Sequence, residues 1–350
     1  MKRFHKMAAI TLALSTCLLS ACSDQSNHTA RYRDNPITRN VFAMNTYNTF
    51  TVYDDISGDV LESAENQLKA LESLWSVTDE QSEIYAINHG GGQSIPVSHR
   101  TAELLRFSLE MAKRTDGNLD ITIYPLLTAW GFTTDNKQVP TDEQIAALMQ
   151  YVGYDKISLS ENTVTLLPGM EIDLGAVAKG YACDLVTENL QANGVTSAIV
   201  SLGGNIRVIG SKPDDSDWKI SVEHPENRNS LGLLSLSDVS VVTSGTYERY
   251  FEDESGKRYG HILDPSTGKP AQSGLASVTV VGKESKVCDA LATAFFVMGL
   301  PAAEEYFREY GDIDFLLLTE NGEIYLTNGL KDKFTLSEAY KNMFVNVIGQ

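Results

Sequence analysis

The chain has 350 residues, of which 46 are acidic and 28 are Lys or Arg, so its formal net charge is −18 at pH 7. A protein this acidic is repelled by nucleic acid and by anionic lipid, and no basic stripe offsets the repulsion, which argues against nucleic-acid binding. The length suits one large domain or two coupled ones, and we find no internal repeat.

The N-terminus is arranged like a secretory signal. A cationic head, MKRFHK, precedes an apolar run that is too short to cross a bilayer comfortably and ends in small residues. Leu-Ser-Ala followed by Cys22 resembles a bacterial lipoprotein signal. The resemblance implies removal of residues 1–21, acylation of Cys22 and a membrane-anchored protein that faces the periplasm, with Ser23 typical of outer-membrane sorting. An ordinary cleaved signal is the alternative.

The segment after Cys22 predicts a spacer. Residues 23–38 are polar and aperiodic, as flexible linkers are. We therefore divide the chain into a signal peptide at 1–21, a flexible tether at 22–39 and one domain at 40–350. Loss of Lys2, Arg3 and Lys6 with the signal takes the net charge to −21.

The first half of the domain shows local signals of both helix and strand. Residues 41–54 are rich in β-branched and aromatic side chains and predict a strand. Apolar residues at helical spacing predict helices over 58–74 and 101–113. Thr141 and Gln144 stand at capping-box spacing and predict the start of a third helix. Residues 156–167 predict a small hairpin.

The second half is dominated by strands. A long helix should follow residues 171–180 and end at Gly194. Residues 196–281 hold short strand-like runs separated by turn signals. Helices return over 286–299 and from Pro301, and an Asn-Gly pair within 314–329 predicts a hairpin. Helices and strands thus come in blocks, which favours an α+β fold with a mostly antiparallel sheet.

Four cysteines do not make a disulfide framework here. Cys17 leaves with the signal, and Cys22 is the expected lipid attachment site. Cys183 and Cys288 remain, without CxxC spacing, and they predict either two buried free thiols or one disulfide.

Five short blocks hold residues that a pure scaffold does not need. Asp289 and Thr293 lie one turn apart on an otherwise apolar helix. Their oxygens suit Mg²⁺ that is held partly by substrate phosphates. The alternative is that Asp289 caps the helix and Thr293 faces the core. The other blocks centre on Asp120 in an apolar stretch, Lys179 among small residues at a helix start, the pair Gly203-Gly204, and His261 before the turn at Asp264. Small residues around Lys179 can let a ligand come close to the backbone, and amides at a helix start favour an anionic group.

Each of these blocks also has a structural interpretation. Asp120 could cap the next element, and Lys179 could be a solvated lysine at a helix start. His261 could be a strand-end histidine satisfied by a carbonyl, with the following Asp-Pro-Ser-Thr-Gly segment only a turn. Neither of the common nucleotide-phosphate loops, GxGxxG and GxxxxGK[ST], is present.

Taken in order, the blocks resemble the ApbE family of FAD:protein FMN transferases from about residue 40 to the end of the chain. The resemblance rests on MNT at 44–46, SVTDEQSEIYAIN at 76–88, GNLDIT at 117–122, DLGAVAKG at 173–180, SLGGNI at 201–206, HILDPSTGKP at 261–270 and CDALATA at 288–294. It implies an ApbE-like (T-fold-like) architecture, FAD as the substrate, Mg²⁺ as the metal and an extracytoplasmic setting.

The resemblance assigns roles residue by residue. Asp289 and Thr293 match the magnesium side-chain ligands, and the Ala176 carbonyl matches the third protein ligand. His261 matches the histidine of the motif His-x-x-Asp-Pro-x-Thr-Gly, which implies a catalytic role close to the reacting phosphate. The positions that match the surroundings of FAD are Met44, Thr78, Asp79, Glu80, Asp120, Lys179 and Ile262. The chain departs from the family at Asn45, where many members have glycine, and at Val77-Thr78, where an aromatic residue is frequent.

The implied reaction moves the FMN half of FAD onto a Thr or Ser hydroxyl of a partner protein through a phosphoester bond and releases AMP. The implied acceptors are extracytoplasmic flavoprotein subunits of membrane respiratory complexes. Two other functions stay open at this point. A magnesium-dependent pyrophosphatase would use water instead of the protein hydroxyl and give FMN and AMP, and a flavin-binding lipoprotein would hold FAD without chemistry.

Overall fold

The computed structural model describes residues 32–134, 136–245, 247 and 249–349. The predicted signal peptide, the lipid attachment site Cys22 and the first part of the predicted tether lie outside these residues.

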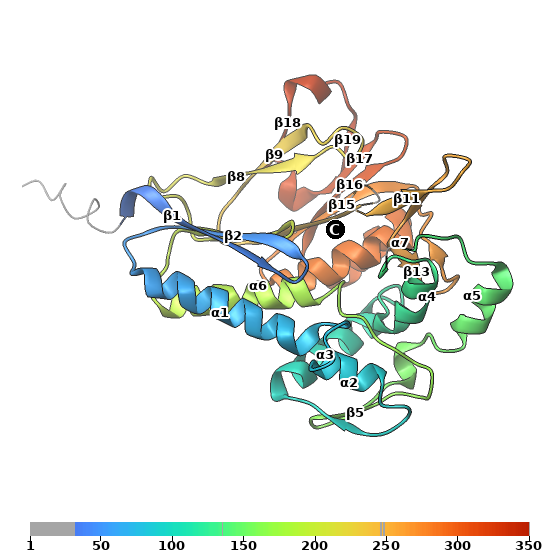
Figure 1. Ribbon diagram of the computed structural model, residues 1–350. Helices are drawn as coiled ribbons and strands as arrows, with labels where there is room; N and C mark the ends of the chain where they lie inside the picture. Colours follow the sequence, from blue (N-terminus) through green and yellow to red (C-terminus); the bar gives the residue numbers. More distant parts are fainter. Residues whose placement is uncertain (1–31, 135, 246, 248, 350) are drawn as a thin grey trace, which may run out of the picture.

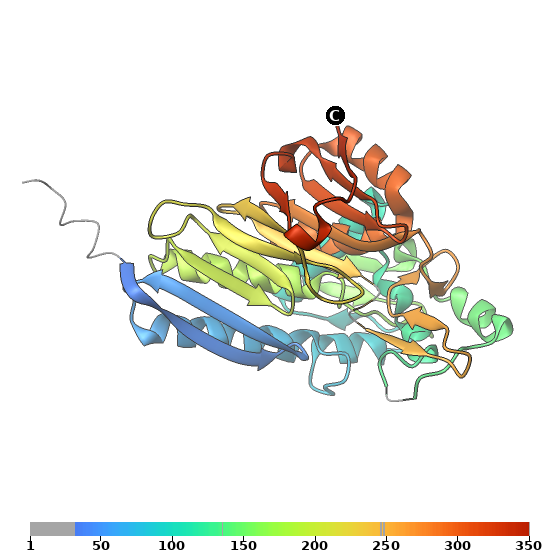
Figure 2. The same ribbon diagram turned by 90° about the horizontal axis from the view of Figure 1, so that it is seen from above.

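Nine strands of the described chain form one large sheet with the order β1-β2-β6-β7-β10-β15-β16-β17-β19. β17 and β19 run parallel, and the other neighbours are antiparallel, so the predicted α+β class with a mostly antiparallel sheet is confirmed. Figure 2 shows the sheet from the blue β1–β2 edge to the red C-terminal edge. The strands are β1 (Tyr32–Ala43), β2 (Thr46–Asp54), β6 (Ala198–Leu202), β7 (Asn205–Ile209), β10 (Ser240–Gly245), β15 (Leu275–Gly282), β16 (Asp314–Thr319), β17 (Ile324–Thr327) and β19 (Val345–Ile348).

Helices cover one face of this sheet, and a smaller sheet covers the other (Figure 1). The side chains of β16 alternate between two cores, so both faces of the sheet must be covered. Phe315 and Leu317 belong to the core under the helices, whereas Leu316 and Leu318 belong to the core under the small sheet. The helices are α1 (Gly58–Trp75), α2 (Glu83–Asn88), α3 (His99–Arg114), α4 (Tyr124–Ala129), α5 (Asp142–Met149), α6 (Ala178–Ala192) and α7 (Ser285–Tyr310), with 3₁₀ turns η1 (Ile121–Ile123), η2 (Tyr154–Lys156), η3 (Asn328–Leu330) and η4 (Glu338–Tyr340).

The small sheet over the second face has the order β18-β9-β8. Its β8 alternates buried and exposed residues, as a strand with one covered face should. The bounds of the strands outside the large sheet are β3 (Ile95–Pro96), β4 (Ser158–Ser160), β5 (Thr163–Thr165), β8 (Trp218–Glu223), β9 (Ser230–Leu236), β11 (Tyr250–Glu252), β12 (Arg258–Gly260), β13 (Leu263–Asp264), β14 (Lys269–Pro270) and β18 (Phe334–Leu336).

The helix α7 is interrupted at Gly299, whose φ of 80° is left-handed. Pro301 lies at the start of the following stretch, which agrees with the two helices that the sequence predicts here. Among the described helices, α7 alone is long and apolar enough to cross a membrane, but 61% of its apolar window is buried inside the fold. It is therefore packed as a core helix.

The prediction of one strand over residues 41–54 is wrong, because the segment is a hairpin. β1 and β2 pair from Ala43↔Thr46 outward, and Met44 and Asn45 form the turn with φ of 54° and 56°. Hairpin turns of this kind need positive φ at both positions and usually contain glycine. Without a Gly or Pro, the segment lacks the usual signal of a turn. Asn tolerates this conformation better than most residues, which accounts for Asn45 where glycine is common.

The tether is shorter than predicted, because β1 begins at Tyr32 and so includes residues 32–39. They lie in a strand at one edge of the described sheet, where Arg33, Asn35, Thr38 and Arg39 are exposed, which accounts for their polar character. The strand pairing is irregular between Tyr32 and Ile37, a stretch that contains Pro36. Such irregularity is where an edge strand accommodates proline.

Most other predicted elements are confirmed. The capping box of α5 is complete, with the Thr141 side chain accepting from the Gln144 N–H and the Gln144 side chain accepting in return. α6 ends just before Gly194. The six-residue α2 was not predicted, because so short a helix shows no periodicity. β10 was not among the predicted strand-like runs. Cys183 and Cys288 are buried free thiols, and burial raises the pKa of Cys183 to about 12.

Candidate active site

One cavity of about 1000 Å³ gathers most of the residues that the sequence singled out. Its walls come from the β1–β2 turn, the β6–β7 turn, the start of α6, the first turns of α7 and the segment that precedes β13. The predicted site residues that line it are Met44, Thr78, Asp120, Ala176, Lys179, His261, Ile262, Asp289 and Thr293.

Asp79 and Glu80 are exposed and do not line this cavity. They lie in the loop between α1 and α2, where Asp79 Oδ1 accepts a hydrogen bond from the Gln81 N–H over 3.0 Å. The Thr78 N–H donates to Ser76 Oγ over 3.2 Å. The structure therefore brings Thr78 to the cavity but not the two acidic residues after it.

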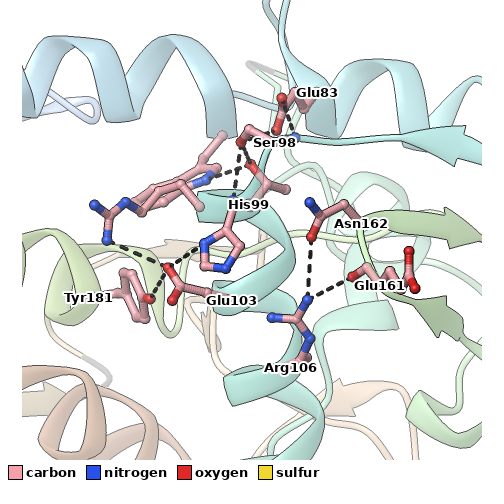
Figure 3. Close-up of polar contacts among 11 residues, drawn as sticks. Glu83, Ser98, His99, Glu103, Arg106, Glu161, Asn162 and Tyr181 are labelled. Carbon is pink, nitrogen blue, oxygen red and sulfur yellow. Dashed lines mark hydrogen bonds and ion pairs between the residues drawn. The ribbon is translucent and has the colours of Figure 1, made fainter.

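The loop that carries Thr78 is tied to the start of α3 at both ends; Figure 3 shows the contact between Glu83 and Ser98. At the end of α1, Trp75 Nε1–H donates to Thr101 Oγ1 over 3.1 Å. At the start of α2, the Glu83 carboxylate accepts from the Ser98 N–H at 2.8 Å and from Ser98 Oγ at 2.9 Å. These contacts fix the loop at the edge of the cavity.

Asp120 is buried, and its carboxylate is engaged by the protein. Oδ1 accepts from the Thr122 N–H at 2.8 Å and from Thr122 Oγ1 at 2.6 Å, while Oδ2 accepts from the Tyr154 N–H at 2.8 Å. Burial raises the pKa of Asp120, and these three hydrogen bonds oppose the rise. The capping interpretation is confirmed, and Asp120 stiffens this wall of the cavity.

Asp289 joins the starts of α6 and α7. Its Oδ2 accepts from the Gly180 N–H over 2.8 Å. A Cβ on Gly180 would lie 2.4 Å from the Ser285 carbonyl oxygen and 2.6 Å from Asp289 Cβ. We expected the small residues around Lys179 to admit a ligand, but at Gly180 the small size admits α7 instead, and the Gly180 amide is occupied by Asp289.

The capping interpretation of Asp289 is wrong. Glu284 occupies the N-cap position of α7, and the first amides of the helix are capped from outside it. Asp184 of α6 accepts from the N–H groups of Ser285 at 2.7 Å and Lys286 at 3.0 Å. Asp289 is therefore left to face Gly180 and the cavity. Thr293 also lines the cavity rather than the core.

Asp289, Thr293 and the Ala176 carbonyl offer the hard oxygen atoms that Mg²⁺ prefers. Only one carboxylate is in the set, and the described residues contain no group of three or more His, Cys, Asp and Glu that could hold a metal. Such a set leaves coordination positions for substrate phosphates and water. Burial raises the pKa of Asp289, a rise that the positive charge of Lys179 opposes, and a bound cation would favour the carboxylate further. The residues therefore fit magnesium.

Cationic and donor groups that the sequence did not single out also line the cavity. Arg228 and Arg249 join Lys179 there, which suits a phosphorylated ligand. Asn205 is 2% exposed, and its Nδ2 makes no hydrogen bond of ordinary length in the described part of the chain, but its side chain lies near enough to the Asp289 carboxylate to lower the pKa of that group. The position of Asn205 directly after Gly203-Gly204 could have identified it as a candidate from the sequence. The two arginines lie in polar loops, where no local pattern marks them.

His261 is held by a backbone carbonyl and faces the cavity. Its Nδ1 lies 3.1 Å from the Arg249 carbonyl oxygen, and its backbone N–H donates to the same oxygen. Because a carbonyl can only accept, Nδ1 carries the proton and Nε2 keeps the lone pair. Burial, together with the positive charges of Arg249 and Lys179, lowers the pKa of His261 to about 4, although the hydrogen bond to the Arg249 carbonyl opposes the shift. His261 is therefore a neutral imidazole at pH 7.

The segment after His261 is the turn that the sequence predicts. Asp264 Oδ1 accepts from the Ser266 N–H at 2.8 Å and from Ser266 Oγ at 2.7 Å. Gly268 has a φ of 69°, and β13 and β14 pair across the turn. The turn thus closes a short hairpin immediately after the histidine.

The comparisons with known proteins agree with this architecture. The profile of the ApbE family matches residues 44–317. The chain is 34% identical over 274 residues to the FAD:protein FMN transferase of Klebsiella pneumoniae (strain 342), covering 77% of this chain and 84% of that protein. It is 33% identical over 287 residues to the FAD:protein FMN transferase of Haemophilus influenzae, covering 78% and 83%.

Solved structures give the same result. The ApbE protein of Thermotoga maritima matches with a TM-score of 0.77 at 32% identity, covering 88% of this chain and 98% of that chain. Flavin transferase ApbE of Vibrio cholerae matches with a TM-score of 0.74 at 27% identity, covering 88% and 100%. By sequence and by fold, the chain belongs to the ApbE family.

Proposed function

We propose that this chain transfers the FMN moiety of FAD to a Thr or Ser hydroxyl of a target protein and releases AMP. The relatives named FAD:protein FMN transferase support the reaction class. The observation that carries the proposal is that His261, Lys179, Asp289 and Thr293 line one cavity. This arrangement supports a site in which a base, a cation and metal-ligand oxygens act on one pyrophosphate.

In this proposal His261 accepts the proton of the acceptor hydroxyl at Nε2. The hydroxyl oxygen forms a new bond to the phosphorus on the FMN side, and the bond from that phosphorus to the oxygen bridging it to AMP breaks. The bond electrons leave with AMP, which can take the proton back from His261. The negative pyrophosphate should raise the low pKa of His261 and make it a better base in the complex.

Lys179, Arg228 and Arg249 would bind and orient the phosphates, with Asn205 Nδ2 as a further donor. Asp289, Thr293 and the Ala176 carbonyl would hold Mg²⁺. When bound there, the metal supplies charge neutralisation and polarisation of the phosphoryl oxygens. Met44, Thr78 and Ile262 would contact FAD, whereas Asp79 and Glu80 could act only if the loop moves toward the ligand.

The setting of the reaction is also part of the proposal. The lipoprotein-like N-terminus supports cleavage before Cys22, lipid attachment there, and a domain on the periplasmic side of a membrane. Extracytoplasmic flavoprotein subunits of respiratory redox complexes would then be the acceptors. Globomycin should stop the cleavage if the leader is a lipoprotein signal, and unaltered processing in its presence would reject the lipid anchor.

The test of the reaction is to incubate the mature chain with FAD and Mg²⁺, with and without an acceptor subunit. AMP that appears together with a fluorescent acceptor band supports transfer. AMP and free FMN without acceptor would make the chain a pyrophosphatase instead. Retained FAD without AMP in either sample would indicate a binding protein.

A further inference from the structure

The β1–β2 hairpin carries an exposed aromatic pair at the mouth of the cavity. Phe42 and Tyr47 are cross-strand partners, and their rings meet edge to face with centroids 5.1 Å apart. Phe42 is 59% exposed and Tyr47 is 79% exposed. Aromatic side chains are enriched at protein–protein contacts, where they often dominate binding.

The position of the pair links it to the reaction. Of the large apolar side chains that are exposed in the described chain, Phe42 alone also lines the cavity. Tyr47, its neighbour, lies outside the lining. The pair therefore spans the border between the cavity and the outer surface of the protein.

The hairpin is built to hold this pair still. Asn48 is buried, and its Nδ2 lies 3.2 Å from the Val41 carbonyl, 3.0 Å from that of Ala43 and 3.2 Å from that of Thr46. A further hydrogen bond of 2.7 Å ties the turn to α1. A contact surface that is ordered before binding loses less conformational entropy on association.

We propose that Phe42 and Tyr47 are the docking site of the acceptor protein. They would receive an apolar side chain near the Thr or Ser that accepts FMN. This inference rests on the proposed function, because only a protein substrate must place one hydroxyl in the cavity while the rest of its chain stays outside. The outer part then lies against the rim, where this aromatic pair is exposed.

The test replaces Tyr47, which does not line the cavity. Transfer of FMN to a purified extracytoplasmic flavoprotein subunit would be measured at saturating FAD and varied acceptor. Tyr47→Ser should raise the KM for the acceptor about tenfold and leave kcat unchanged. Tyr47→Phe should restore the wild-type KM. AMP release without acceptor and the KM for FAD should not change.

Phe344→Ser is the matched control. Phe344 is 79% exposed, like Tyr47, but it adjoins β19 at the opposite edge of the described sheet. This variant should keep the wild-type KM for the acceptor. Adding Phe42→Ser to Tyr47→Ser should raise that KM further.

Several outcomes would overturn the inference. An unchanged acceptor KM in Tyr47→Ser would remove the docking role, and a raised KM for FAD would assign the pair to the nucleotide. If the wild-type chain sediments as a dimer and Tyr47→Ser sediments as a monomer, the aromatic pair is a contact with a second copy of the chain. If the wild-type chain modifies no acceptor, the proposed function fails and this inference fails with it.

Discussion

The Gly180 N–H donates to Asp289 Oδ2 over 2.8 Å, and this bond joins the start of α6 to the first turns of α7. The same carboxylate is the only acidic side chain in the candidate magnesium set. Asp289 therefore takes part both in the packing of the two helices and in the candidate cation site. The two partners lie 109 positions apart in the chain.

Gly180→Ala should destabilise the fold. The new Cβ would meet the Ser285 carbonyl oxygen at 2.4 Å, so α6 and α7 must separate. We expect a loss of about 1–3 kcal/mol in the free energy of unfolding, measured by urea denaturation. Gly58→Ala at the start of α1 is the control, because its Cβ meets nothing within 4 Å. Equal stability of the two variants would contradict the close contact.

Asp289→Asn should separate folding from metal binding. The amide oxygen can still accept from Gly180, while the buried charge is lost, so the variant should fold and keep a Tm at least as high as the wild type without metal. Added Mg²⁺ should raise the Tm of the wild type but not of the variant. AMP release in the variant should fall by about 10²-fold or more. A variant that Mg²⁺ stabilises as it does the wild type would rule out Asp289 as a ligand.

His261→Ala should remove chemistry and retain binding. We expect single-turnover transfer to slow by about 10²–10⁴-fold, the usual contribution of a general base, with little change in the FAD dissociation constant. His99→Ala is the control, since the His99 side chain is 72% exposed on α3. Turnover at the wild-type rate in His261→Ala would remove this residue from the mechanism.

The activity should tolerate mildly acidic buffer. Because the pKa of His261 is lowered to about 4, its base form predominates well below pH 7. We expect kcat/KM for FAD to stay level down to about pH 5.5 and to fall as the pH approaches about 4. A pH profile with its acid midpoint at 6.5, the ordinary histidine pKa, would show that the free enzyme does not depress this pKa.

The same shift predicts a pH dependence of stability. The pKa of an unfolded histidine is 6.5, and the pKa of His261 in the folded chain is about 4. Between these two pH values the unfolded chain binds a proton that the folded chain does not. His261 thus costs no stability above about pH 6.5 and destabilises the fold, by at most roughly 3 kcal/mol, as the pH falls toward 4. The stability of His261→Ala relative to the wild type should therefore increase as the pH is lowered. If the difference in the free energy of unfolding between the two proteins, measured by urea denaturation, stays constant across this pH range, the lowered pKa of His261 is contradicted.

Local patterns were sufficient for much of the fold and for part of the site. Asp289 and Thr293 could be placed on one helix face because helical periodicity is local, and both line the cavity. The capping box of α5 and the end of α6 at Gly194 follow from residues within a few positions. The β1–β2 turn was not predicted, because Met44 and Asn45 adopt positive φ without a glycine.

The rest depends on partners that are distant in sequence. One of the three hydrogen bonds to the Asp120 carboxylate comes from the Tyr154 amide, and no spacing rule connects these two residues. The helix that packs against Gly180, α7, follows about a hundred residues later, so no local pattern indicates this contact. Gly180 was therefore interpreted as space for a ligand. Arg249 lies in a loop that lines the cavity. Its backbone carbonyl fixes the tautomer of His261, and because every residue has such a carbonyl, the sequence does not indicate this contact.

The most direct test of the account is a single-turnover reaction with FAD, Mg²⁺ and an acceptor subunit, in which AMP and protein-bound FMN are both quantified. We predict equal amounts of the two products with the wild-type chain, FMN mapped by mass spectrometry to one Thr or Ser of the acceptor, and neither product above background with His261→Ala. AMP without protein-bound FMN, or equal yields from His261→Ala, would contradict transfer at this cavity.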